Sequence, residues 1–195
     1  MNFSLNKNER RVGVVVIIGL LIALNLVFTR VFYFQAFQNT VRVGLGNLTI
    51  LIAGMVFGPL AGAVTGGLAD FIGATFISPF GWYPPLTTAP ILVGLISGIM
   101  WRYVVNRPSK SSEANFKADY VNVIKIFLVI LITNIIANIT VGTYWISVLI
   151  NTNFWAIVVP RAIVSLSITF FETFVIYFIY KSKLIYIMRG TRTRI

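Results

Sequence analysis

The sequence contains no cysteine and no histidine among its 195 residues. A disulfide, a thiol nucleophile, an imidazole base and thiolate or imidazole metal ligands are therefore excluded. Charged residues make up only 11% of the chain, which is less than half of the ~25% usual in soluble domains. These absences exclude most familiar active sites. We expect a protein that is not an enzyme and that uses no metal or cofactor.

Hydrophobic residues, in contrast, make up 57% of the chain, and the mean hydropathy is +0.87. Because a membrane-spanning helix needs about 20 apolar residues, this composition predicts a protein that crosses the membrane several times. The second predicted span is short, and the sixth begins at Phe154 or at Pro160, where a proline starts or kinks a helix. The six predicted spans are Val12–Phe28, Leu45–Phe57, Leu60–Ile77, Leu86–Val105, Val121–Tyr144 and Phe154 or Pro160 to Tyr180.

The remaining segments fit a single integral membrane domain over residues 1–195. The basic flank and apolar run at the start resemble a signal peptide, but no small-residue cleavage site follows, so we expect the first helix to be retained. Residues 1–11 and 182–195 are predicted to be cytoplasmic tails. Residues 106–119, which read NRPSKSSEANFKAD, are predicted to be a cytoplasmic linker.

The distribution of positive charge predicts the orientation. If both termini are cytoplasmic, all but three of the 16 Lys and Arg residues lie on the cytoplasmic side. This is the asymmetry of the positive-inside rule, and it places the charge beside anionic lipid, which argues against binding of nucleic acid. The expected fold is an all-α membrane protein, a bundle of six transmembrane helices with both termini in the cytoplasm.

Three basic residues, Arg30, Arg42 and Arg161, remain on the outer side and need local reasons. Arg30 can snorkel from the end of the first helix. Arg42 begins a short extended stretch, where a surface role and a ligand role are both open. Arg161 follows Pro160 near the outer end of the sixth helix, and Glu172 lies about 16 Å along the axis, too far to pair with it. Arg161 is therefore the preferred candidate for binding an anionic ligand.

Polar residues also occur at membrane depth in the third and fifth helices. Asp70 continues the four-residue step of Gly58, Gly62 and Gly66, so this glycine face is expected to meet other helices. Asn134 and Asn138 form a similar stripe at a depth that Asp70 could share. Polar groups at such depth usually pair inside the bundle. Substrate binding and purely structural hydrogen bonding remain open for all three polar residues.

An aromatic and proline-rich loop follows the glycine-rich helix. This region resembles the membrane-embedded S component of energy-coupling factor (ECF) vitamin transporters, in particular the folate-specific branch. The resemblance is carried by RVGLGNLTILIAGMVFGPLAGAVTGGLADFIGATF, by the aromatic loop after it and by the following YPPLTTAPILVGLISG. LLIALNLVFTR in the first helix, Thr-Tyr-Trp in the fifth and the Pro160-Arg161 step extend the resemblance over nearly the whole chain outside the tails and the linker.

The resemblance implies a high-affinity folate-binding subunit in the bacterial cytoplasmic membrane. Such a subunit delivers substrate inward by reorienting in the membrane, together with a transmembrane coupling (T) subunit and two cytoplasmic ABC ATPases. The absence of a G-x-x-x-x-G-K-[ST] motif agrees with this division of labour. Aromatic residues could stack on the planar parts of folate, asparagines could bind the pterin edge and arginines the carboxylates. The predicted substrate-binding residues are Arg161, Arg42, Asn138, Asn134, Trp82, Tyr83, Phe80 and Asp70.

Two alternatives concern individual parts of this prediction. The loop aromatics could instead form an interfacial belt. Gly19 and Ala23, four residues apart on the first helix, match the small-residue pair by which S components meet the coupling subunit, or they could pack within the bundle itself. For the whole chain, the alternatives are an S component for another vitamin and a stand-alone carrier with Asp70 or Glu172 as its proton site.

Overall fold

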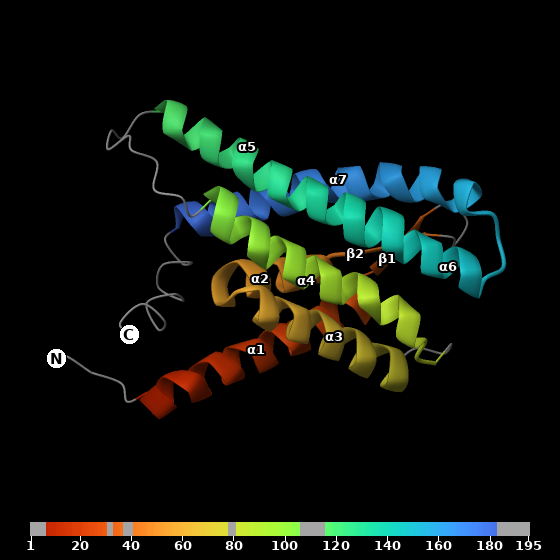
Figure 1. Ribbon diagram of the computed structural model, residues 1–195, viewed down its shortest axis with the longest axis horizontal. Helices are drawn as coiled ribbons and strands as arrows, with labels where there is room; N and C mark the ends of the chain where they lie inside the picture. The colour runs from red at the N-terminus through yellow and green to blue at the C-terminus, as the bar shows by residue number, and fades with distance from the viewer. Residues whose placement is uncertain (1–6, 31–32, 37–40, 78–80, 106–115, 183–195) are drawn as a thin grey trace.

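The computed structural model describes residues 7–30, 33–36, 41–77, 81–105 and 116–182, with side chains described over 12–30, 44–77, 81–105 and 121–182. Within these ranges the chain forms a bundle of helices that run roughly along the longest dimension of the molecule (Figure 1). The start of α1 and the end of α7 lie at the same end of the bundle. We call the opposite end, which carries the hairpin, η1 and residues 150–153, the hairpin end.

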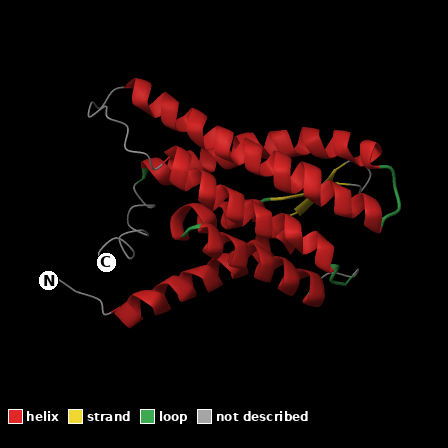
Figure 2. Cartoon of the chain, viewed as in Figure 1, coloured by secondary structure: helices red, strands yellow, loops and turns green. Residues whose placement is uncertain are grey.

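Helices account for almost all of the described structure, and a short hairpin is the exception (Figure 2). The hairpin pairs β1 (Tyr33–Ala36) with β2 (Val41–Gly44) in antiparallel register. The π-helical η3 joins α5 and α6 into one helical run, and η1 and η2 flank α4. The helices are α1 (Lys7–Arg30), α2 (Gly46–Phe57), α3 (Pro59–Phe76), η1 (Pro84–Thr87), α4 (Thr88–Met100), η2 (Trp101–Val105), α5 (Phe116–Thr133), η3 (Asn134–Gly142), α6 (Thr143–Leu149) and α7 (Phe154–Lys181).

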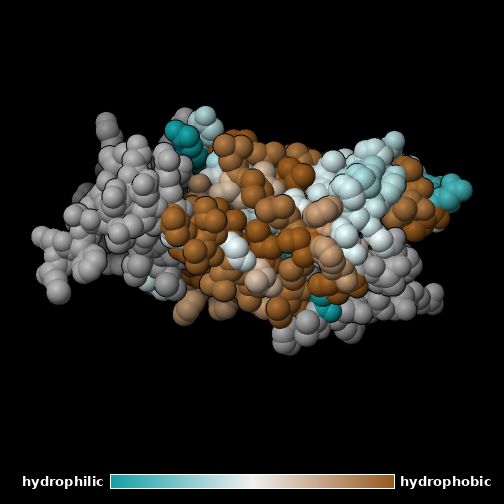
Figure 3. Space-filling model, turned by 90° about the horizontal axis from the view of Figure 1, so that it is seen from below, coloured by the Kyte–Doolittle hydropathy of each residue, from teal (hydrophilic) through white to brown (hydrophobic). Residues whose placement is uncertain are grey.

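Among the described residues, four helical segments are long and apolar enough to cross a membrane: Val12–Arg30, Pro84–Val105, Val121–Leu149 and Phe154–Lys181. Helix α2 has 12 residues and is therefore only about 18 Å long, shorter than the ~30 Å hydrocarbon core. Apolar residues form a broad band across the middle of the face shown in Figure 3. Elsewhere in the described residues, large apolar side chains such as Val16, Leu20 and Leu68 are exposed, which suits the protein to a lipid environment.

The six predicted helical segments are all present, but some of their bounds differ from the prediction. The fifth extends through α6 to Leu149, beyond the predicted end at Tyr144. Helix α5 begins at Phe116 and therefore includes the last four residues of the predicted cytoplasmic linker. The sixth helix begins at Phe154, where the side chain of Asn153 accepts a hydrogen bond from the backbone of Trp155 at 3.1 Å. Pro160 therefore lies inside the helix and does not start it.

Glycines allow α2, α3 and α4 to approach closely, as the glycine stripe predicts. A Cβ atom built on Gly62 would lie 2.6 Å from the carbonyl oxygen of Gly94 and 2.7 Å from the Cα of Gly54. A Cβ on Gly66 would collide with the backbone of Pro90. Gly58, with φ of 100°, turns the chain between α2 and α3, a conformation that favours glycine. The glycine face therefore positions α3 and α4, whose ends carry several candidate site residues.

Replacing Gly62 by alanine is expected to destabilise the bundle by about 1–3 kcal/mol, because the added methyl group would meet rigid backbone on two neighbouring helices. Thermal unfolding of the detergent-solubilised protein measures this effect. Gly67→Ala is a matched control on the same helix, since its Cβ would meet only the flexible side chain of Ile91 at 3.2 Å. Equal melting temperatures for the two variants would contradict the assignment of the tight contact to Gly62.

Candidate functional site

Several segments that are far apart in sequence meet at the hairpin end of the bundle. The 3-10 turn η1 contacts α6, and β2 contacts α7, the helix that carries Arg161 (Figure 1). A Cβ on Gly142 would lie 3.5 Å from the Cβ of Ala89 and 3.6 Å from Nη2 of Arg161. The start of α4, the end of η3 and the first turns of α7 therefore converge beside Gly142.

The first polar group of this region joins α3 to η1. The Thr87 hydroxyl donates to Oδ2 of Asp70 at 2.7 Å, and Nε1 of Trp82 donates to Oγ1 of Thr87 at 2.9 Å. The Trp82 ring packs edge-on against Phe71, with ring centroids 4.9 Å apart. Asp70 thus holds η1 against α3 through Thr87, which is the structural role left open from the sequence. Trp82 is held in place by the same threonine while remaining 43% exposed.

The second polar group lies between η3 and α7. Nδ2 of Asn134 donates to Oγ1 of Thr169 and to Oε2 of Glu172, both at 2.9 Å. Nδ2 of Asn138 donates in turn to Oδ1 of Asn134 at 2.7 Å. Asn134 and Glu172 are buried, whereas Asn138 is half-buried. Asn134 makes the interhelical hydrogen bonds that the sequence left open as an alternative to substrate binding, and Asn138 lies between it and Gly142.

Arg161 lies on α7 at the level of Gly142, eleven residues from Glu172 along the same helix. Among the described side chains it makes no hydrogen bond and no ion pair. Glu172 does not pair with it, as the helical rise predicts. The guanidinium is half-buried next to η3 and can accept an anionic partner.

The remaining predicted binding residues are only partly described. Tyr83 is half-buried directly before η1, and its carbonyl oxygen accepts from the backbone of Leu86 at 3.0 Å. Arg42 lies in β2 opposite Gln35, in agreement with the predicted extended stretch, but its side chain lies outside the described residues. Phe80 lies outside the described residues altogether.

Gly19 and Ala23 both lie on an exposed face of α1. A Cβ on Gly19 would meet no atom within 4 Å. The buried residues Leu21 and Asn25 point the other way, toward the bundle. The small-residue pair therefore does not pack within the described part of the chain.

Sequence reasoning missed three polar residues that organise this region: Asn25, Thr87 and Thr169. Nδ2 of Asn25 donates to the carbonyl oxygen of Gly46 at 2.7 Å and to Oγ1 of Thr49 at 2.9 Å, which fixes the start of α2 against α1. A lone asparagine in an apolar run is a signal that could have identified it. Threonines give no such signal, because in a helix their hydroxyls can bond to the backbone of their own preceding turn.

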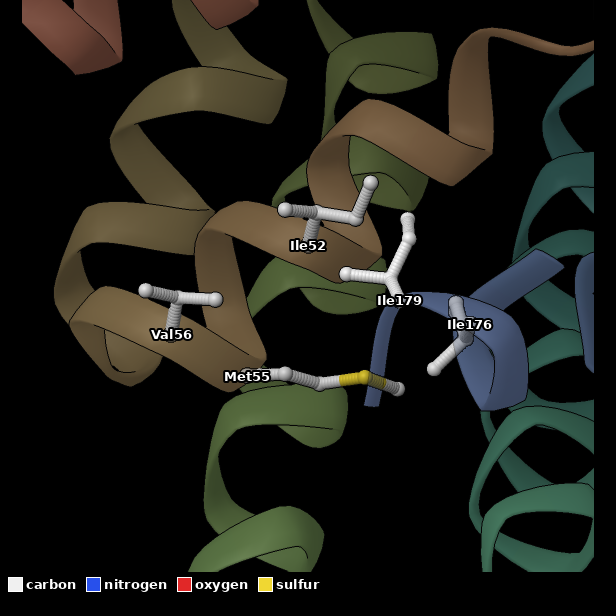
Figure 4. Close-up of a pocket in the computed structure, with 5 residues that line it drawn as sticks. All are labelled: Ile52, Met55, Val56, Ile176 and Ile179. Atoms are coloured by element: carbon white, nitrogen blue, oxygen red, sulfur yellow. The ribbon is translucent and has the colours of Figure 1, made fainter. Parts of the chain in front are cut away.

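A shallow hollow between α2 and α7 lies apart from the polar groups. Ile52, Met55 and Val56 from α2 meet Ile176 and Ile179 from α7, and all five side chains are apolar (Figure 4). This lining offers no hydrogen-bonding group to a polar ligand. The candidate site is therefore the polar region at the hairpin end.

Known proteins resemble this arrangement in both sequence and fold. The family model described as "ECF-type riboflavin transporter, S component" matches residues 10–183, which is most of the chain. The chain belongs to this family of S components. The resemblance stated from the sequence is thereby confirmed, and an S component is part of a transporter and not an enzyme.

Individual relatives of this S component carry the name of another vitamin. The folate transporter FolT of Clostridium novyi is 25% identical over 72% of each chain. FolT of Leuconostoc mesenteroides is 23% identical over 87% of this chain and 85% of its own. A crystal structure of FolT bound with folic acid superimposes with a TM-score of 0.65, at 23% identity over 84% of this chain and 90% of that one. The S component therefore shares the fold of FolT.

Proposed function

We propose that this S component binds folate at the hairpin end of the bundle with high affinity. The observation that carries the proposal is the guanidinium of Arg161, which has no hydrogen-bond or ion-pair partner among the described side chains and lies on the same η3–α7 interface as the amide of Asn138. Folate has a flat pterin with a hydrogen-bonding edge and two carboxylates at its other end. The amide of Asn138 lies deeper in the bundle and the cation of Arg161 lies nearer the hairpin end. This arrangement matches the two ends of folate, with the pterin inside and the glutamate outside.

Riboflavin is the second candidate, because the matching family model carries its name. Its flavin ring also has amide-like edges that Asn138 could bind. Its ribityl chain is uncharged, however, so it gives Arg161 no anionic partner. The charge of Arg161 therefore favours folate, in agreement with the names of the two curated relatives.

The transport cycle in this proposal follows from the family. The S component lies in the bacterial cytoplasmic membrane with six membrane-spanning segments and both termini in the cytoplasm, so that the hairpin end faces outward. The coupling subunit and two ABC ATPases supply the energy, and the loaded subunit reorients to release folate inward. The exposed pair Gly19 and Ala23 is the proposed contact with the coupling subunit.

The purified chain is expected to bind one folate and to show no ATPase activity. The reason is that its polar site suits a vitamin with carboxylates, and its sequence lacks a phosphate-binding loop. Calorimetry with folate, riboflavin, thiamine and biotin, together with an ATPase assay, measures both properties. Tighter binding of riboflavin than of folate would reject the substrate and would leave the membership of the S component family in place.

A further inference from the structure

The hydrogen bonds between η3 and α7 all run from donors on η3 to acceptors on α7, and groups on α7 determine this direction. The hydroxyl of Thr169 donates to the carbonyl oxygen of Ser165 at 2.8 Å, so its oxygen is left to accept. Oε2 of Glu172 also accepts. Both acceptors face Asn134, and an amide can satisfy them only with its NH₂ group. Two independent groups on α7 therefore fix which way the Asn134 amide is turned.

The orientation of the Asn134 amide in turn determines the orientation of the Asn138 amide, the next one along η3. Because the NH₂ group of Asn134 faces α7, its Oδ1 faces Asn138 and accepts from Nδ2 of that residue at 2.7 Å. The amide of Asn138 is then fixed as well. Its Oδ1 makes no hydrogen bond in the described part of the chain, and one of its two N–H groups is also left over. Asn138 thus retains one acceptor and one donor.

We infer that Glu172 and Thr169 are positioning residues that act through Asn134 to hold the carbonyl oxygen and one N–H of Asn138 ready for the ligand. The inference rests on the proposed function and specifies its recognition step. Neither positioning residue needs to touch the ligand itself. Their effect is on selectivity, because they prevent the amide from turning over to suit a ligand with the opposite pattern.

A carboxamide with a free oxygen and a free N–H is complementary to a cyclic amide, which presents N–H and C=O side by side. The pterin of folate has such an edge, formed by its N3–H and its 4-oxo group. In the 2,4-diamino analogue of folate this edge is reversed, since an amino group replaces the oxo group and N3 becomes an acceptor. The fixed Asn138 amide should therefore accept folate and reject the diamino analogue of nearly the same shape.

The test compares the affinities of folate and its 2,4-diamino analogue by calorimetry on the full chain. The wild-type protein should prefer folate by at least about tenfold, the effect of one mismatched buried hydrogen bond. In the double variant Thr169→Val/Glu172→Gln the valine removes one acceptor and the glutamine can donate or accept. Asn134 and Asn138 can then turn over together, and the affinity for the diamino analogue should rise by about tenfold.

Single variants and a neighbouring control separate positioning from general damage. Either single variant leaves one acceptor in place and should retain most of the preference for folate. Thr173→Val removes a buried hydroxyl that bonds to the backbone of Thr169 at 2.7 Å and does not reach Asn134, so it should not change the ratio of the two affinities. A structural defect could lower both affinities, but it would not increase the affinity for the analogue.

Three results would overturn the inference while leaving the proposed function intact. They are equal binding of both ligands by the wild-type protein, no gain for the analogue in the double variant, and the same gain in Thr173→Val. Absence of folate binding to the wild-type protein would instead reject the proposed function. The two failures are therefore distinguishable in one set of titrations.

Discussion

Replacing Arg161 by alanine is expected to weaken folate binding roughly 10- to 150-fold, which corresponds to about 1.5–3 kcal/mol for a charge-assisted hydrogen bond. The guanidinium lies beside Gly142 and makes no hydrogen bond or ion pair with another described side chain, so its removal should not disturb the bundle. Calorimetry on the detergent-solubilised variant, with its melting temperature measured in parallel, gives both quantities.

Two controls show whether the loss comes from a carboxylate contact. Arg102→Ala removes the same charge from an exposed position on η2, at the other end of α4, and should leave the affinity unchanged. A pterin that lacks the glutamate should bind the wild type and Arg161→Ala equally well, because it has no carboxylate for Arg161 to hold. An unchanged affinity for folate in a well-folded Arg161→Ala protein would remove this residue from the site.

The sequence predicted the helices well because apolar length is a strong signal for membrane segments. Its errors concern the ends of helices, where local signals compete. For the sixth helix the sequence left starts at Phe154 and at Pro160 open, and the structure has the earlier one, because Asn153 caps α7 at Phe154 and the helix continues through the proline. The fifth helix was predicted to end at Tyr144, but it continues through α6 to Leu149.

The site was predictable only in part, because residue type suggests which groups can bind, whereas packing decides which groups meet. The four-residue step of Gly58, Gly62 and Gly66 correctly predicted a close helix contact, but nothing in that step identifies Gly54 and Gly94 as its partners. The pairing of Asn134 with α7 depends likewise on the register of two helices that are distant in sequence.

Hydroxyl groups were the most difficult to assign from sequence. Thr87 bridges Asp70 and Trp82, and Thr169 takes part in fixing Asn134, yet each is an ordinary residue in an apolar context. Asp70 illustrates the converse, because an acidic residue at membrane depth suggests a ligand or proton site. In this structure its hydrogen bond goes to the loop that leads into α4, which is a structural contact.

Replacing Gly19 and Ala23 together by tryptophan is expected to abolish association with the coupling subunit and to stop uptake, while the folate affinity of the isolated chain changes by less than about twofold. The two small residues lie on the exposed face of α1, where another helix can approach closely. Large side chains would prevent this close approach. Co-purification of the coupling subunit and folate titration of the isolated chain measure the two effects separately.

The matched control places the same side chains on another exposed apolar face. Phe170 and Phe174 are also four residues apart, on α7, and they are 64% and 69% exposed. Tryptophans at these positions should leave both association and folate binding intact, so that a loss confined to α1 identifies the docking face and not a general effect of bulk. If folate binding were lost together with association in the α1 variant, the pair would instead support the bundle, and the partner surface would have to lie elsewhere.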